Sequence, residues 1–128
     1  GKTSEIIDHY GLRVANVFHA GDGNMHPLIL FDANDPDESM KAEMAGNDIL
    51  KLCVDAGGCL TGEHGVGIEK RDLMRHQYSD ADLAQQMRVR AAFDPKWILN
   101  PSKVFPLDGR NGSQTGNQSA AGDDRTAA

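Results

Sequence analysis

The sequence predicts an α+β fold in which antiparallel strands carry helices on one side. Residues 12–19 alternate their side chains with the two-residue period of a strand, and residues 27–32 (PLILFD) form a second strand-like run. After Asp35, apolar residues recur at steps of three and four, which is the spacing of a helix with one apolar face. A sheet of two strands is marginally stable alone, so we expect further chain or another subunit to cover its apolar faces.

The first elements are expected to be a helix and a hairpin. Residues 3–10 read as the end of a helix, and Gly11 is a suitable C-terminal stop. Residues 12–19 and 27–32 are the two predicted strands. Pro27 suits the first position of a strand, because no backbone donor is needed there. The residues between the strands are rich in glycine and predict the hairpin loop.

The next helix has a strong local start signal. Asp35 is the expected N-cap, Pro36 occupies the first helical position and Glu38 the third. Gly57 and Gly58 end the helix, and residues 59–61 are expected to be a short extended piece. The apolar stripe along this helix consists of Ala42, Ala45, Ile49, Leu52 and Ala56.

A second capping signal, Ser79 with Asp82, predicts a last helix that the Asp94–Pro95 pair stops. Residues 94–106 are expected to form a loop in which Trp97 is a packing anchor.

Residues 109–128 contain no Leu, Ile, Val, Phe, Met, Tyr or Trp. Such a segment buries too little apolar surface to offset the entropy of ordering it, so we expect a disordered tail.

The chain has 128 residues and a formal net charge of −6, from 13 Lys and Arg against 19 Asp and Glu. An acidic chain without a basic run is a poor candidate for binding nucleic acid. It starts at Gly1 rather than Met, and we expect a piece of a longer protein. Cys53 and Cys59 are too few for a disulfide scaffold and are expected to be reduced thiols of a cytoplasmic protein, with Cys53 buried.

Two histidines flank the predicted hairpin loop. His19 closes one strand and His26 opens the next, so a hairpin brings both imidazoles close together. Imidazole pairs of this kind are a common start to a site for zinc or a similar divalent cation. Asn24 and Asp22 suit the turn or an outer hydrogen bond to the imidazoles. The alternative is a polar hairpin with two incidental histidines.

A second candidate group lies in the run Gly62-Glu63-His64-Gly65-Val66-Gly67. Glu63 offers an oxygen ligand, and two histidines with one carboxylate leave positions open on a cation, as a catalytic site requires. His64 is then available as a general base, because an imidazole titrates near neutral pH. The alternative is a tight turn with a solvated Glu-His pair. The run lacks the pattern of a phosphate-binding loop.

Three runs together resemble a known family: VFHAGDGNMHPLILFD, GGCLTGEHGVGIEK and AAFDPKWILNPSKVFP. They are similar to the C-terminal part of FAD-linked 2-hydroxyacid oxidases and dehydrogenases of the vanillyl-alcohol oxidase type. This family includes the flavin-bearing subunit of glycolate oxidase. The resemblance implies that residues 1–93 are part of a substrate-binding cap domain and that residues 94–108 return toward the flavin domain, whose lobes this chain lacks.

The resemblance also implies roles for single residues. His19, His26 and Glu63 match the ligands of a divalent metal, usually zinc in relatives, and His64 matches the proposed base. Asn24 matches a polar residue near the substrate. Asn100 matches an asparagine close to the flavin ring. Ser102 stands where relatives commonly have glycine.

The implied activity is oxidation of a small 2-hydroxy acid, glycolate or a D-lactate-like acid, to the 2-keto acid by hydride transfer to FAD. The parent protein is expected to be cytoplasmic, or held at a membrane by other glycolate oxidase subunits, and the isolated fragment to be inactive. Two alternatives stay open: a non-catalytic module that self-associates through its apolar faces, and a self-contained metal hydrolase.

Overall fold

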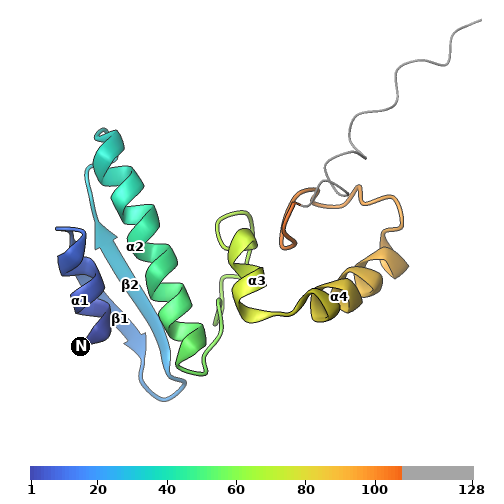
Figure 1. The fold of residues 1–128 in the computed structure, drawn as a ribbon, viewed down its shortest axis with the longest axis horizontal. Coiled ribbons are helices and arrows are strands. Elements are labelled where there is room, and N and C mark those ends of the chain that lie inside the picture. Colours follow the sequence, from blue (N-terminus) through green and yellow to red (C-terminus); the bar gives the residue numbers. More distant parts are fainter. Residues whose placement is uncertain (108–128) are drawn as a thin grey trace, which may run out of the picture.

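The computed structural model describes residues 1–107. Figure 1 shows a hairpin flanked by two helices, followed by a second group of helices and a looping segment. The elements in order are α1 (Lys2–His9), β1 (Arg13–His19), β2 (Asn24–Leu30), α2 (Pro36–Asp55), the 3-10 turn η1 (Arg71–Leu73), α3 (Met74–Gln77) and α4 (Asp80–Phe93). The predicted tail at 109–128 lies outside the described residues, as does the last residue of the predicted return segment.

The two strands form an antiparallel hairpin, as predicted, but the second strand starts earlier than expected. β2 begins at Asn24, opposite His19, and ends at Leu30, so the loop is confined to residues 20–23. The backbone N–H of Asp22 donates to the carbonyl of His19 at 3.1 Å, and Gly23 has a φ of +68°. A left-handed residue here lets the chain reverse within this short loop.

Both flanking helices pack on one face of the hairpin, which confirms the predicted arrangement. Their shared core consists of Ile7, Leu12, Ala42, Ala45 and Ile49, with Val14 and Ile29 packed against it. Gly46 brings α2 close to the sheet, since a Cβ there would lie 3.9 Å from Cδ1 of Ile29. The start of α2 is capped as expected, because the Asp35 side chain accepts hydrogen bonds from the backbone of Asp37 and Glu38.

A side-chain hydrogen bond joins the end of α1 to the middle of α2. The Tyr10 hydroxyl donates to Oδ2 of Asp48 at 2.7 Å, and Lys51 Nζ lies 3.2 Å from the other carboxylate oxygen. The Tyr10 hydrogen bond, with help from Lys51, lowers the pKa of Asp48. The same contact raises the pKa of Tyr10.

Among the described residues, much of the opposite face of the hairpin is left exposed. Val17, Leu28 and Leu30 remain about half exposed there, at 52%, 51% and 47%. The pairing of Val17 with His26 and of His19 with Asn24 places the two histidines on this same open face. The face therefore combines exposed apolar side chains with the two histidines.

A second core follows α2. Leu60, Met74 and Leu83 are buried in it, and Leu50, Val54 and Val66 pack around them. The inner surface of α2 thus turns from the sheet toward this second core along its length. Cys53 is consequently exposed, and the prediction that it is buried was wrong. α4 begins with the predicted capping box, in which Ser79 and Asp82 bond reciprocally.

The segment after α4 folds back rather than extending freely. The Asp94 carboxylate, 8% exposed, accepts hydrogen bonds from the backbone of Ile98 and Leu99. The Arg90 guanidinium lies 4.5 Å from the centre of the Trp97 ring, which supports the expected anchoring role of that ring. The backbone N–H of Val104 donates to the carbonyl of Gly67 at 2.8 Å, so the segment closes on the loop before η1.

Candidate functional site

The hairpin brings the two predicted histidine ligands together. His19 is the last residue of β1, and His26 is the third residue of β2. The centres of their rings are 5.3 Å apart, and the ring planes are nearly perpendicular. The hairpin thus presents two imidazoles from neighbouring strands at one end of the open face.

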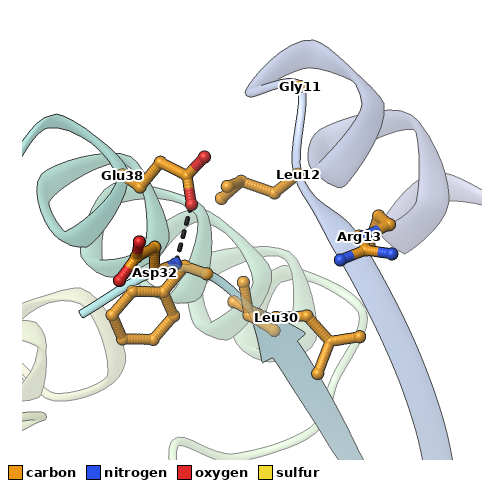
Figure 2. A pocket seen from close by; sticks show the side chains of 8 residues that line it. Gly11, Leu12, Arg13, Leu30, Asp32 and Glu38 are labelled. Carbon is orange, nitrogen blue, oxygen red and sulfur yellow. Dashed lines mark hydrogen bonds between the residues drawn. The ribbon is translucent and has the colours of Figure 1, made fainter. Parts of the chain in front are cut away.

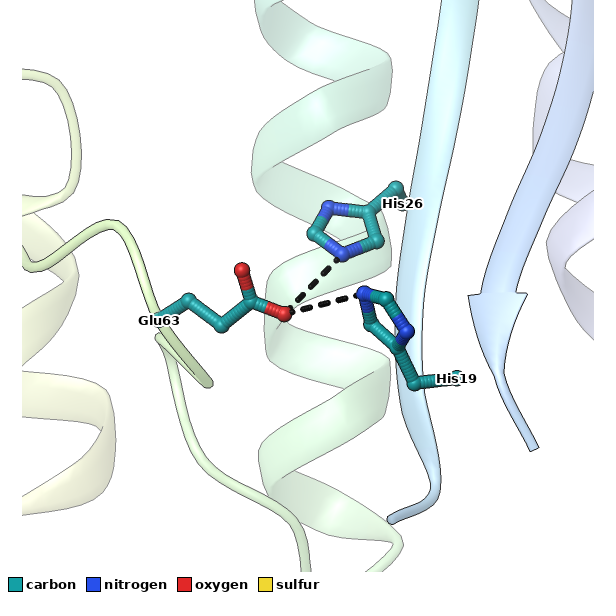
Figure 3. A group of neighbouring side chains, drawn as sticks. All are labelled: His19, His26 and Glu63. Carbon is teal, nitrogen blue, oxygen red and sulfur yellow. Dashed lines mark ion pairs between the residues drawn. The ribbon is translucent and has the colours of Figure 1, made fainter. Parts of the chain in front are cut away.

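Glu63 reaches these histidines from the loop after α2 (Figure 3). Its Oε1 atom lies 3.2 Å from Nε2 of His19 and 3.4 Å from Nε2 of His26. The three ligand atoms all lie within 4.8 Å of one another. The structure therefore assembles two nitrogen donors and one carboxylate oxygen around one point, although Glu63 is distant from both histidines in sequence.

The group is open to solvent on one side. The side chains of His19 and Glu63 are 54% and 45% exposed, whereas that of His26 is 23% exposed. A cation or a small substrate can therefore reach the group directly. Ion pairs as exposed as these contribute little stability by themselves, about 0–1 kcal/mol.

The loop that carries Glu63 is held in a tight turn. The Thr61 hydroxyl accepts a hydrogen bond from the backbone N–H of Gly65 at 2.8 Å, and Gly65 has a φ of +82°. The turn leaves the predicted base, His64, beside the group. Its Nε2 lies 3.9 Å from Oε2 of Glu63, and its ring centre lies 5.4 Å from that of His26.

Asn24 joins the same group of side chains through a contact with Glu63. Its Nδ2 donates to Oε1 of Glu63 at 2.5 Å. Sequence reasoning missed this contact because β2 was expected to start three residues later. With the strand starting at Asn24, the pairing opposite His19 would have placed the amide on the histidine face.

Asn100 is not brought to this group. It is exposed in the segment after α4, where its carbonyl lies 3.4 Å from Nη2 of Arg90. Figure 1 shows that segment curving back from the end of α4 toward α3, apart from the hairpin. The role of Asn100 at a flavin ring stays a prediction, and so do the proposed limits of the cap and return segments.

A cavity of about 590 Å³ lies at the other end of the hairpin (Figure 2). Its walls combine apolar side chains with one cation and two carboxylates. Glu38 closes one side, since its Oε2 accepts a hydrogen bond from the backbone of Asp32 at 2.7 Å. The lining residues are Gly11, Leu12, Arg13, Ile29, Leu30, Phe31, Asp32 and Glu38. None of the predicted site residues lines this cavity.

Comparison with known proteins defines the class. The model of the family "FAD linked oxidases, C-terminal domain" matches residues 1–104. The chain therefore belongs to this family, as the sequence motifs indicated. No helix among residues 1–107 is long and apolar enough to cross a membrane.

Three relatives show how similar the chain is to individual proteins. The chain is 54% identical over 103 residues to the glycolate oxidase subunit GlcD of Escherichia coli (strain K12). The matched residues make up 80% of the chain and 21% of that protein. It is 40% identical over 106 residues to a mitochondrial D-lactate dehydrogenase [cytochrome] of Kluyveromyces lactis, with coverage of 83% and 18%. A D-2-hydroxyglutarate dehydrogenase of Stutzerimonas stutzeri is 39% identical over 89 residues, with coverage of 68% and 19%. The chain spans about a fifth of the length of these relatives.

Proposed function

We propose that this chain is the cation-binding part of an FAD-dependent enzyme that oxidises a small 2-hydroxy acid, glycolate or a D-lactate-like acid, to the 2-keto acid. The observation that carries the proposal is the convergence of His19, His26 and Glu63 in a chain of this family. The names of the relatives support the substrate class, because all three act on short 2-hydroxy acids by name.

The donor set fits a divalent cation, and zinc is the proposed one. Zinc binds imidazole nitrogen and carboxylate oxygen, and three protein ligands leave a coordination position for substrate. Both histidines already direct Nε2 toward the same carboxylate oxygen. When bound, the cation supplies Lewis acidity that lowers the pKa of the substrate hydroxyl.

His64 is the proposed general base. Its side chain is 74% exposed beside the ligand group, so a substrate held there can meet its Nε2 atom. The imidazole accepts the proton of the 2-hydroxyl as the hydride leaves C2. When bound, FAD would supply the two-electron oxidation as the acceptor of the hydride from C2. Asn100 remains the residue proposed to lie near the flavin ring.

The alternatives have less support. A metal hydrolase could use the same donors, but membership of an FAD-linked oxidase family favours redox chemistry. Self-association would need the open sheet face. In a protein as long as the relatives, the other four-fifths of the chain could cover this face instead. Because the Escherichia coli relative is named as a subunit, we also propose that the parent enzyme works with other subunits.

Reduction of the flavin by substrate tests the activity. The protein, purified at its natural length with bound FAD, is mixed anaerobically with glycolate, D-lactate or D-2-hydroxyglutarate while the flavin absorbance is followed. Bleaching with glycolate, and less with the other two acids, is the expected result. Bound flavin that bleaches with none of the three would remove the substrate class.

A substitution tests the assigned base. His64→Ala should retain the metal but reduce turnover by about 10²–10⁴-fold, the usual contribution of a positioned base. His9→Ala is the matched control, because His9 is exposed at the end of α1. Unchanged turnover in His64→Ala would end the role of base, and loss of the metal would make His64 a ligand.

A further inference from the structure

We infer that Asn24 is a positioning residue whose side-chain amide holds the Glu63 carboxylate at the two histidines, and that Gly62 leaves room for this amide. The inference rests on the proposed metal site. It assigns to Asn24 a role through Glu63, which differs from a direct contact with substrate.

The hydrogen bond has the geometry needed for this role. Asn24 Nδ2 lies 2.5 Å from Oε1 of Glu63, the same oxygen that faces both imidazoles. An amide N–H can donate to a carboxylate, whereas an amide oxygen turned the same way would repel it. A hydrogen bond to an ionised acceptor is roughly twice as strong as one between neutral groups. The contact therefore fixes which carboxylate oxygen points at the histidines.

The backbone at position 62 is shaped around this amide. A Cβ there would lie 2.6 Å from Oδ1 of Asn24 and 2.8 Å from its Cγ. Position 62 is not among the glycines with a positive φ, so its backbone conformation suits any residue. The three heavy atoms nearest to such a Cβ all belong to the Asn24 side chain, so an added side chain must push the amide away.

This arrangement predicts coupled substitutions. Asn24→Ala should weaken zinc binding by about 10–100-fold, as is typical when an outer partner of a ligand is removed. Gly62→Ala should cause a similar loss, because the new methyl group displaces the amide from Glu63. In the Asn24→Ala background, Gly62→Ala should cost nothing more, since the obstructing amide is already absent.

Two matched controls isolate the effect. Asn16→Ala removes an exposed asparagine whose place in β1, opposite Pro27, puts it on the other face of the sheet. Gly21→Ala adds a methyl group in the hairpin loop where nothing lies within 4 Å. Both controls should bind zinc like the wild type.

The experiment measures zinc affinity by competition with a chromogenic chelator, using the protein at its natural length. The unfolding midpoint without metal is measured for each variant. Equal unfolding midpoints with weaker zinc binding in Asn24→Ala and Gly62→Ala, and no further loss in the double variant, would support the inference. If Gly62→Ala alone fails to fold, recovery of folding in the double variant would still demonstrate the steric contact and support it.

Other outcomes would overturn it. Wild-type affinity in Asn24→Ala, or additive losses in the double variant, would remove the positioning role while leaving the metal site intact. A higher KM for glycolate with unchanged zinc affinity would place Asn24 at the substrate instead. A wild-type protein that binds no zinc would refute the metal site itself and the inference with it.

Discussion

Replacing Glu63 by glutamine should separate metal binding from folding. The substitution keeps the size of the side chain and removes its charge. Glu63 is 45% exposed, and its partner His19 is 54% exposed. An ion pair as exposed as this contributes about 0–1 kcal/mol, so the free energy of unfolding without metal should change by less than ~1 kcal/mol.

The effect on zinc should be much larger. An outer hydrogen-bond partner of a ligand is worth about 10–100-fold in metal affinity, and a ligand that contacts the metal directly should be worth more. Since each tenfold step is about 1.4 kcal/mol, Glu63→Gln should cost more than roughly 1.4–2.8 kcal/mol of zinc binding. The expected loss in binding therefore exceeds the expected loss in stability.

Two measurements on the same sample check this prediction. Zinc affinity is obtained by chelator competition, and stability without metal by urea denaturation. Glu69→Gln is the matched control, because Glu69 is exposed a few residues further along the same loop. Wild-type zinc affinity in Glu63→Gln would refute the reasoning, and so would a loss of stability above 2 kcal/mol without a change in affinity.

Two further predictions concern stability. Ser102 has a φ of +62°, a conformation that costs a residue with a Cβ about 1–2 kcal/mol. The extra chain entropy of glycine costs about 0.5–1 kcal/mol, so Ser102→Gly should stabilise the protein by about 0–1.5 kcal/mol. A lower urea midpoint in that variant would contradict this. Tyr10→Phe should raise the pKa of Asp48, because the hydroxyl that lowers it is gone. A carboxyl group whose pKa is lowered in the folded state stabilises the fold at pH values above its ordinary pKa of about 3.9. This stabilisation is lost as the pH falls through the lowered pKa. The difference in melting temperature between wild type and Tyr10→Phe should therefore vanish in strong acid. An NMR titration of Asp48 that is identical in the two proteins would exclude the coupling.

The elements with local signals were predictable from sequence. The Asp35 cap and the Ser79–Asp82 capping box are both present in the structure. These signals involve groups within a few residues of one another, so they act whatever the rest of the chain does. The residues that could bind a metal or transfer a proton were equally visible, because an adjacent glutamate and histidine between glycines form an unusual local sequence.

Boundaries and exposure were less predictable. β2 starts at Asn24 because a left-handed Gly23 closes the loop early, a choice that apolar periodicity does not report. Cys53 lies near the apolar stripe of α2 but is exposed, because Leu50 and Val54 turn that part of the helix toward a different core. Where a helix meets two cores, one stripe cannot describe its buried face.

The sequence by itself determined the family, the order of the two strands and the longer helices α1, α2 and α4, and which residues carry ligand chemistry, but it did not predict the short η1 and α3. Only the tertiary structure decided that Glu63 meets both histidines and that Asn24 bonds to Glu63, 39 residues further along the chain. Periodicity and capping reflect interactions between near neighbours, whereas these contacts depend on how the loop after α2 returns to the open face of the hairpin. The requirement for glycine at position 62 likewise exists only once the Asn24 amide lies against it.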